Sequence, residues 1–153
     1  MAGSDITSSQ PKLSAFGNQS LNISQTTRRT SGERSLTQFE GQRYIALETF
    51  KRNGQGVKTA VWFIEDGGRL YIWTPATTGK ARRIRNSPRV RVMPSSASGK
   101  PKGEWVEAKA HILNPPDNTH PAELIRKKYG LQFWLINWLH GRDRIIIELE
   151  PAP

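Results

Sequence analysis

A Thr-Thr-Gly-Lys run at residues 77–80, followed by two arginines, is the segment of this sequence best suited to bind a phosphate. It falls between a predicted strand and a predicted short helix, and the free amides and positive dipole end of a helix start attract anions. Gly79 would permit close approach of the backbone, and Lys80 would add a point charge. The pattern alone favours a capped surface helix with solvated cations, because the first glycine of a Walker motif is missing.

The strand from Lys58 to Trp62 is a second candidate surface, made of Lys58, Thr59, Ala60, Val61 and Trp62. Its edge could present backbone amides and the aromatic plane of Trp62 to a flat ring. An ordinary core strand explains the same residues, and the pattern alone favours that interpretation.

The chain lacks the residues that several other catalytic chemistries need. It contains no cysteine, so disulfides, thiolate catalysis and thiolate metal sites are excluded. Its three histidines, His111, His120 and His140, do not have metal-ligand spacing, so no metal site is expected. The absence of a Gly-x-Ser-x-Gly motif argues against a hydrolase.

The excess of basic over acidic residues indicates an anionic partner. The chain carries 23 Lys and Arg against 13 Asp and Glu, a formal net charge of +10. Residues 67–103 contain nine of these cations and no acidic residue: Arg69, Lys80, Arg82, Arg83, Arg85, Arg89, Arg91, Lys100 and Lys102. This segment is therefore where a bound phosphate is expected.

The first 34 residues are predicted to be a disordered tail, and residues 35–153 to be one domain. Ser, Thr, Gln and Asn fill 16 of those 34 positions, which leaves too little apolar surface to offset the entropy of ordering. An organelle transit peptide is an alternative for this arginine-containing tail, but Asp5, Glu33 and the early Pro11 favour plain disorder. With no signal peptide or long apolar run, the expected location is the cytoplasm.

The remaining sequence predicts a mainly β domain with a few short helices. Asn53-Gly54 and Asp66-Gly67-Gly68 supply the positive φ angles of tight hairpins, which predicts a three-stranded meander. The predicted strands are Tyr44 to Phe50, Val57 to Ile64, Arg69 to Thr74, Arg89 to Met93, Glu104 to Leu113 and Ile145 to Ile147, and the predicted helices are Lys80 to Arg85, His120 to Tyr129 and Leu131 to His140.

The helix from Leu131 to His140 has almost no polar face. Such a helix is usually buried against the domain that carries it or against a second subunit. At about ten residues it is too short to span a membrane, so no membrane partner is expected.

Several segments together resemble one known superfamily. They read Tyr-Ile-Ala-Leu-Glu-Thr-Phe from residue 44, Val-Lys-Thr-Ala-Val-Trp-Phe from 57, Gly-Gly-Arg-Leu-Tyr-Ile-Trp-Thr from 67, Gly-Lys-Ala-Arg-Arg-Ile-Arg-Asn-Ser-Pro-Arg-Val from 79, Gly-Glu-Trp-Val-Glu-Ala-Lys-Ala from 103 and Lys-Lys-Tyr-Gly from 127. Over residues 36 to 150 the chain resembles the pyridoxamine 5'-phosphate oxidase-like superfamily, and within it the PPOX-class F420-dependent oxidoreductases. The resemblance implies an FMN-binding split β-barrel, usually a homodimer, with the cofactor in a groove between subunits.

The resemblance also implies site residues. Lys80 and Arg83 would hold the cofactor phosphate, with Thr74 and Thr78 as hydrogen-bond donors and Gly79 beside them. Lys58 falls where the oxidases place an arginine, and Thr59, Ala60, Val61 and Trp62 would back the ring system. Ala60 replaces a proline that the deazaflavin subgroup would have. Phe63 replaces a second basic residue, and the terminal arginine motif is missing, which argues against pyridoxamine phosphate oxidase activity.

The function expected from this resemblance is that of an oxidoreductase. It would use bound coenzyme F420, or alternatively FMN, to transfer hydride or electrons to or from a small-molecule substrate. F420 is favoured, because its lactyl and oligoglutamate tail would use more of the cations in residues 67–103 than one phosphate needs. Two alternatives remain open: a non-catalytic flavin or haem carrier, and a basic nucleic-acid-binding module. The second explains the charge but lacks a recognisable RNA- or DNA-binding pattern.

Overall fold

The computed structural model of this chain describes residues 36–140 and 143–152, so the predicted tail lies outside the described residues. The elements are β1 (Tyr44–Phe50), β2 (Gly56–Asp66), β3 (Arg69–Pro75), α3 (Gly79–Asn86), β4 (Arg89–Ser95), β5 (Val106–Leu113), α4 (Thr119–His140) and β6 (Arg144–Pro151). All the strands and helices expected after residue 43 are present, with boundaries shifted by a few residues.

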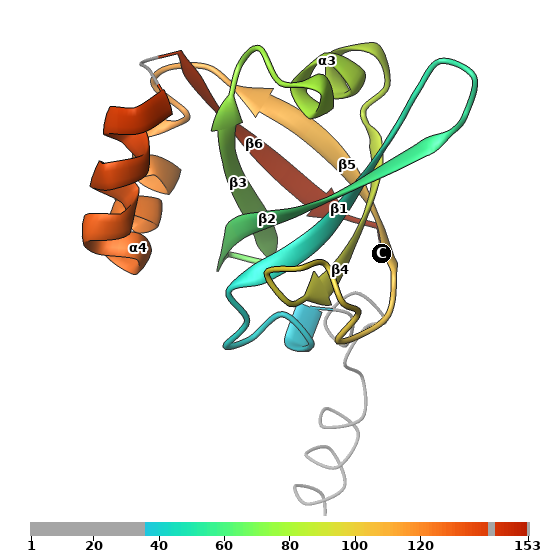
Figure 1. The fold of residues 1–153 in the computed structure, drawn as a ribbon, viewed down its shortest axis with the longest axis horizontal. Coiled ribbons are helices and arrows are strands. Elements are labelled where there is room, and N and C mark those ends of the chain that lie inside the picture. The colour runs from blue at the N-terminus through green and yellow to red at the C-terminus, as the bar shows by residue number, and fades with distance from the viewer. Residues whose placement is uncertain (1–35, 141–142, 153) are drawn as a thin grey trace, which may run out of the picture.

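The six strands form one closed antiparallel barrel in the order β1-β2-β3-β6-β5-β4, and α3 and α4 lie outside it (Figure 1). The predicted mainly β split barrel with a few helices is confirmed. Both glycine turns also behave as expected, because Gly54 has a φ of 85° and Gly67 a φ of 57°.

The barrel interior is filled by alternate side chains of the strands. Ile45 and Leu47 of β1 are fully buried, whereas Ala46 between them faces outward. The same alternation buries the following residues: Phe63, Leu70, Ile72, Val90, Val92, Ile147 and Leu149. The ring of Phe39 packs edge-on against Phe63, with centroids 6.0 Å apart.

The barrel splits between β2 and β3. These strands pair only from Phe63 opposite Ile72 to Asp66 opposite Arg69. Beyond Phe63, β2 continues along β1, with Trp62 opposite Tyr44, whereas β3 continues along β6, with Trp73 opposite Ile146. The two strands therefore diverge at Trp62 and Trp73 and leave a wedge between them.

The two helices flank the open end of this wedge. Thr78 is the N-cap of α3, one of the two threonines, Thr77 and Thr78, that the sequence offers for this position, and its side-chain oxygen accepts a hydrogen bond from the Ala81 amide. In α4, Gly130 interrupts the helix with φ 49° and ψ −124°, which separates the two helices expected from the sequence. None of the helices in the described part of the chain is long and apolar enough to cross a membrane.

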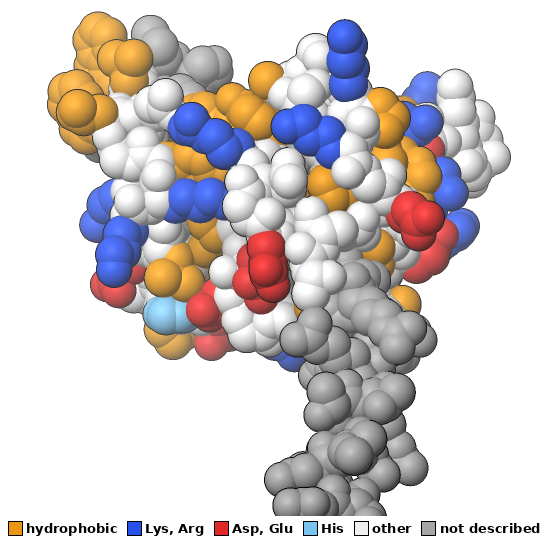
Figure 2. All heavy atoms as spheres, turned by 90° about the horizontal axis from the view of Figure 1, so that it is seen from below, with side chains coloured by type: hydrophobic (Ala, Val, Ile, Leu, Met, Phe, Trp, Pro, Cys, Tyr) orange, Lys and Arg blue, Asp and Glu red, His pale blue; other side chains and the backbone are white. Residues whose placement is uncertain are grey.

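The second half of α4 is exposed rather than packed on the barrel. Leu131, Trp134, Leu135 and Trp138 are 85%, 66%, 53% and 74% exposed. Figure 2 shows hydrophobic side chains gathered at the α4 side of the molecule. Of the two expected ways to bury this helix, burial against the barrel does not apply to these four residues, whereas Phe133 does contact the barrel and stacks on Trp73. Burial by a second subunit remains a prediction.

Candidate cofactor groove

The wedge between β2 and β3 contains a hollow of about 390 Å³. Its lining comes from both diverging strands, from the start of α3 and from β6: Tyr44, Ala60, Val61, Trp62, Trp73, Thr74, Pro75, Lys80 and Arg144. Because β3 does not pair with this part of β2, one edge of β2 faces the hollow instead of another strand. Such an edge suits a flat ligand that accepts and donates hydrogen bonds.

Two aromatic stacks form the walls of the hollow. Trp62 stacks on Tyr129, with centroids 4.8 Å apart and planes 9° apart. Trp73 stacks on Phe133 at 4.6 Å, and the Arg144 guanidinium lies 3.5 Å from the centroid of the Trp73 ring. Tyr129 and Phe133 lie on either side of the Gly130 kink, so α4 supports both walls at once.

Tyr129 fixes α4 to β2 through its hydroxyl group. The hydroxyl oxygen lies 2.6 Å from the Phe63 carbonyl oxygen and accepts a hydrogen bond from the Phe63 amide at 3.0 Å. The Lys128 ammonium donates to the same carbonyl at 2.8 Å. Burial raises the pKa of Tyr129 to about 12, so the phenol stays neutral at physiological pH and acts as a structural anchor.

The polar end of the hollow is built around the α3 N-cap. The Thr74 hydroxyl lies 3.3 Å from the Thr78 hydroxyl and accepts a hydrogen bond from the Lys80 ammonium at 3.4 Å. Burial, and secondarily the nearby Arg83 charge, lowers the pKa of Lys80. The ammonium of Lys80 is therefore held where an additional negative charge would stabilise it.

Arg83 reaches the barrel from the next turn of α3. Its Nε donates to the hydroxyl of Thr49 at 2.7 Å, and Thr49 is 1% exposed. A Cβ atom on Gly79 would come within 2.9 Å of the Arg83 side chain, so a glycine lets this side chain fold over the helix start. Thr49 was not predicted as a site residue, although a hydroxyl at an inward-facing position of β1 is a usable signal.

These cations are not neutralised within the described part of the chain. Lys80 and Arg83 form no ion pair there, and none of the residues lining the hollow is acidic. An anion bound at this end would thus meet two cations, two hydroxyl groups and the start of a helix.

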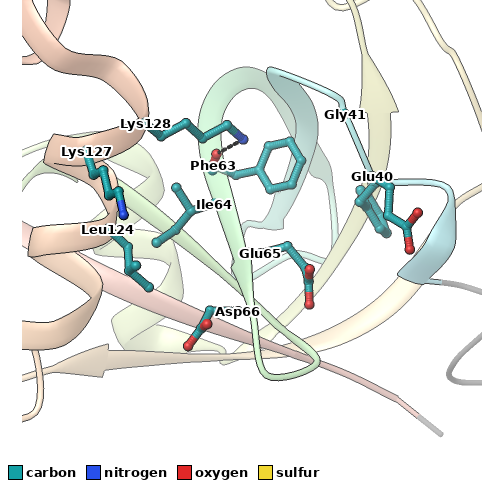
Figure 3. Close-up of a pocket in the computed structure, with 10 residues that line it drawn as sticks. Glu40, Gly41, Phe63, Ile64, Glu65, Asp66, Leu124, Lys127 and Lys128 are labelled. Atoms are coloured by element: carbon teal, nitrogen blue, oxygen red, sulfur yellow. Dashed lines mark hydrogen bonds between the residues drawn. The ribbon is translucent and has the colours of Figure 1, made fainter.

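Another hollow, of about 470 Å³, lies between β2 and the first half of α4 and has a different character (Figure 3). The carboxylates of Glu40, Glu65 and Asp66 share it with Lys127 and Lys128. Acidic groups at its rim make it a poor phosphate site compared with the wedge.

The structure brings together about half of the predicted site residues around the wedge: Ala60, Val61, Trp62, Thr74 and Lys80. Thr78, Gly79 and Arg83 lie directly beside them through the contacts of α3. Lys58 and Thr59 instead line a separate hollow, which shares only Ala60 with the wedge. Four lining residues were missed in the sequence: Tyr44, Trp73, Pro75 and Arg144.

Known proteins share this architecture. No family model matches the sequence, and no curated protein matches it. Among solved structures, a putative pyridoxamine 5'-phosphate oxidase from Listeria innocua has a TM-score of 0.59 at 17% identity, covering 80% of this chain and 94% of that one. The haem storage protein HutZ from Vibrio cholerae has a TM-score of 0.62 at 15% identity, covering 79% and 90%. An F420 reductase has a TM-score of 0.51 at 22% identity, covering 76% and 92%.

The fold is therefore the split β-barrel of pyridoxamine 5'-phosphate oxidase-like proteins, as the sequence resemblance predicts. At these identities the likeness defines the fold alone, and activity has to be argued from the site.

Proposed function

We propose that this protein is an oxidoreductase that binds F420, or alternatively FMN, in the wedge between β2 and β3. It would transfer hydride or electrons to or from a small-molecule substrate. The observation that carries this proposal is the layout of one hollow, which has aromatic walls at Trp62 and Trp73 and an acid-free cationic end at Lys80. A cofactor made of a planar ring joined to a phosphate would place its ring between the aromatic walls and its phosphate at the cationic end.

The residues of the wedge would bind and orient such a cofactor. Lys80 and Arg83 would carry the phosphate charge, and Thr74 and Thr78 would donate hydrogen bonds to its oxygens. For Thr78, this bond would replace the one that its hydroxyl donates to the Pro75 carbonyl at 3.0 Å. The backbone edge of β2 from Ala60 to Trp62 would hold the ring, and the two tryptophan walls would exclude water from it. The cofactor supplies the redox chemistry, so no acid-base pair of the protein is required.

F420 is favoured over FMN by the charge around α3. Arg82 and Arg85 are exposed on this helix without a described ion pair, beside the half-buried Lys80 and Arg83. One phosphate needs fewer cations than this, whereas the oligoglutamate tail of F420 would add further carboxylates.

The haem carrier alternative has less support from the groove. Haem iron takes an axial protein ligand, commonly a histidine. Among the histidines whose side chains the structure describes, the imidazole of His111 lies 3.6 Å from Glu150 and that of His120 lies 3.2 Å from Asp66, and neither residue lines the wedge. A flavin or deazaflavin needs no such ligand.

We further propose that the protein is a homodimer that covers the exposed face of α4. Leu131, Trp134, Leu135 and Trp138 follow the i, i+3, i+4, i+7 spacing of one helix face. A contiguous exposed apolar face of this kind is typical of a subunit interface. It adjoins the wedge through the stacked pair Phe133 and Trp73, so a second copy there would also shield the groove.

Titration of the purified protein with FMN, F420 and haemin separately tests the proposal. We expect saturable binding of F420 or FMN, followed by ligand fluorescence and visible absorption, and much weaker binding of haemin. Preferential binding of haemin would favour the carrier, and no binding of either flavin-type cofactor would refute the proposed function.

A further inference from the structure

A larger hollow, of about 750 Å³, lies on the outer face of the barrel next to the wedge. Its floor is a row of three apolar side chains from adjacent strands: Ala46 of β1 stands opposite Ala60 of β2 and opposite Met93 of β4. Two of the three are alanines, so the floor is smooth and could accept a flat apolar group.

The wall of this hollow carries an aromatic ring and a cation. Trp105 lines it, and the Lys58 ammonium lies 5.3 Å from the centroid of the Trp105 ring. Arg91 lies at a similar distance from this ring, but its charge is met by the buried Glu48, to which Arg91 Nε donates at 2.6 Å. Lys58, although opposite Glu48 in the strand register, forms no ion pair among the described residues.

The rim of the hollow is a basic loop of defined conformation. The Ser96 amide donates to the Lys100 carbonyl at 3.0 Å, and the Lys102 amide donates to the Pro94 carbonyl at 2.8 Å. Ala97, Ser98, Gly99 and Pro101 of this loop line the hollow, and residues 95–103 contain no acidic residue. An anion at the rim would therefore meet Lys58 without a competing carboxylate on the loop.

The two hollows meet at Ala60, which lines both. A ring held along β2 in the wedge would thus be within reach of a molecule lying on the Ala46, Ala60 and Met93 floor. This adjacency is what a redox reaction between a bound cofactor and a second molecule requires.

We propose that this second hollow is the substrate site and that it takes a planar, mainly apolar molecule with one anionic group, such as an aromatic carboxylate. The apolar floor and Trp105 would contact the ring, and Lys58 would pair with the anion. The assignment of this hollow as a substrate site rests on the proposed function. Binding of a ligand in this hollow can nevertheless be measured without any cofactor.

The test uses 2-naphthoate and its neutral analogue 2-naphthalenemethanol as probes for the full-length protein. Dissociation constants are measured by calorimetry for wild type, for Lys58→Met and for the control Lys109→Met, an exposed lysine outside this hollow. We expect 2-naphthoate to bind wild type at least about fivefold more tightly than the alcohol. Lys58→Met should weaken 2-naphthoate binding by about tenfold and leave the alcohol unchanged, whereas Lys109→Met should change neither.

Ala46→Leu supplies an independent variant, since Ala46 lines this hollow and not the wedge. It should weaken both probes with unchanged FMN and F420 affinity. Equal binding of the two probes to wild type, or no effect of Lys58→Met on 2-naphthoate, would overturn the substrate site. If Lys58→Met lost FMN affinity while its 2-naphthoate binding stayed unchanged, Lys58 would instead be assigned to cofactor binding. Failure of the cofactor titration alone would instead reject the proposed function and leave this binding site in place.

Discussion

Replacing Lys80 with alanine should weaken the binding of a phosphate-bearing cofactor by about 1.5 to 3 kcal/mol, or roughly 10- to 150-fold in Kd. The structure supports this range because Lys80 is partly buried, contacts the Thr74 hydroxyl at 3.4 Å and forms no ion pair among the described residues. Its charge has already lost part of its hydration, so a phosphate would recover more free energy there than at an exposed lysine.

The assay compares ligands with and without the phosphate. FMN and riboflavin are titrated by fluorescence against wild type, Lys80→Ala and the control Lys109→Ala. We expect Lys80→Ala to reduce FMN affinity and leave riboflavin affinity unchanged, since both ligands share the ring but only FMN carries the anion. Circular dichroism and thermal unfolding check that the fold is retained.

Two results would refute this reasoning. Equal losses for FMN and riboflavin would mean that Lys80 supports the wall of the hollow rather than the phosphate. Unchanged FMN affinity would mean that Lys80 is a solvated cation of a capped helix, the interpretation favoured by the sequence pattern alone.

Three further experiments address other parts of the molecule. Burial lowers the pKa of Lys80 in the free protein, and a bound phosphate would raise this pKa again. FMN affinity should therefore fall as the pH rises through the pKa of Lys80 in the free protein, and a pH-independent FMN affinity would contradict this. Tyr129→Phe should lower the free energy of unfolding by about 1 to 3 kcal/mol, because the buried Phe63 amide loses its acceptor. Urea denaturation measures this change, and an unchanged midpoint would contradict the anchoring role. Trp134→Ala and Trp138→Ala should each shift the mass measured by light scattering toward monomer and weaken cofactor binding together; a strictly monomeric wild type that binds cofactor tightly would defeat the interface proposal.

The parts of the fold predicted well from the sequence are local. The hairpin at Asn53-Gly54 follows from a glycine with positive φ, and the start of α3 follows from a threonine cap before a helical run. The Gly130 break in α4 is equally local. Each of these features depends on a few neighbouring residues, so a single sequence is enough to place them.

The wedge could not be predicted in the same way, because it arises where two strands stop pairing. Trp62 was predicted as a site residue from the resemblance, but Trp73 looks like an ordinary strand residue in the sequence. Only the end of the β2–β3 register at Phe63 makes both of them face a hollow. Their supports, Tyr129 and Phe133, lie more than 50 residues further along the chain and belong to a helix outside the barrel. Long-range contacts of this kind leave no periodic signal.

Two lysines show why residue type and position along the chain do not identify an anion site. Lys58 and Lys80 were both predicted to contact the cofactor, and each is a lysine near the start of an element, β2 for Lys58 and α3 for Lys80. In the structure Lys80 is partly buried at a helix start beside two hydroxyl groups, whereas Lys58 is exposed at the rim of another hollow and lies over Trp105. Burial makes the first lysine dependent on a compensating charge, while the second remains hydrated and can pair with an anion that arrives and leaves. This difference in desolvation is the physical basis for assigning the cofactor phosphate to Lys80 and the substrate anion to Lys58.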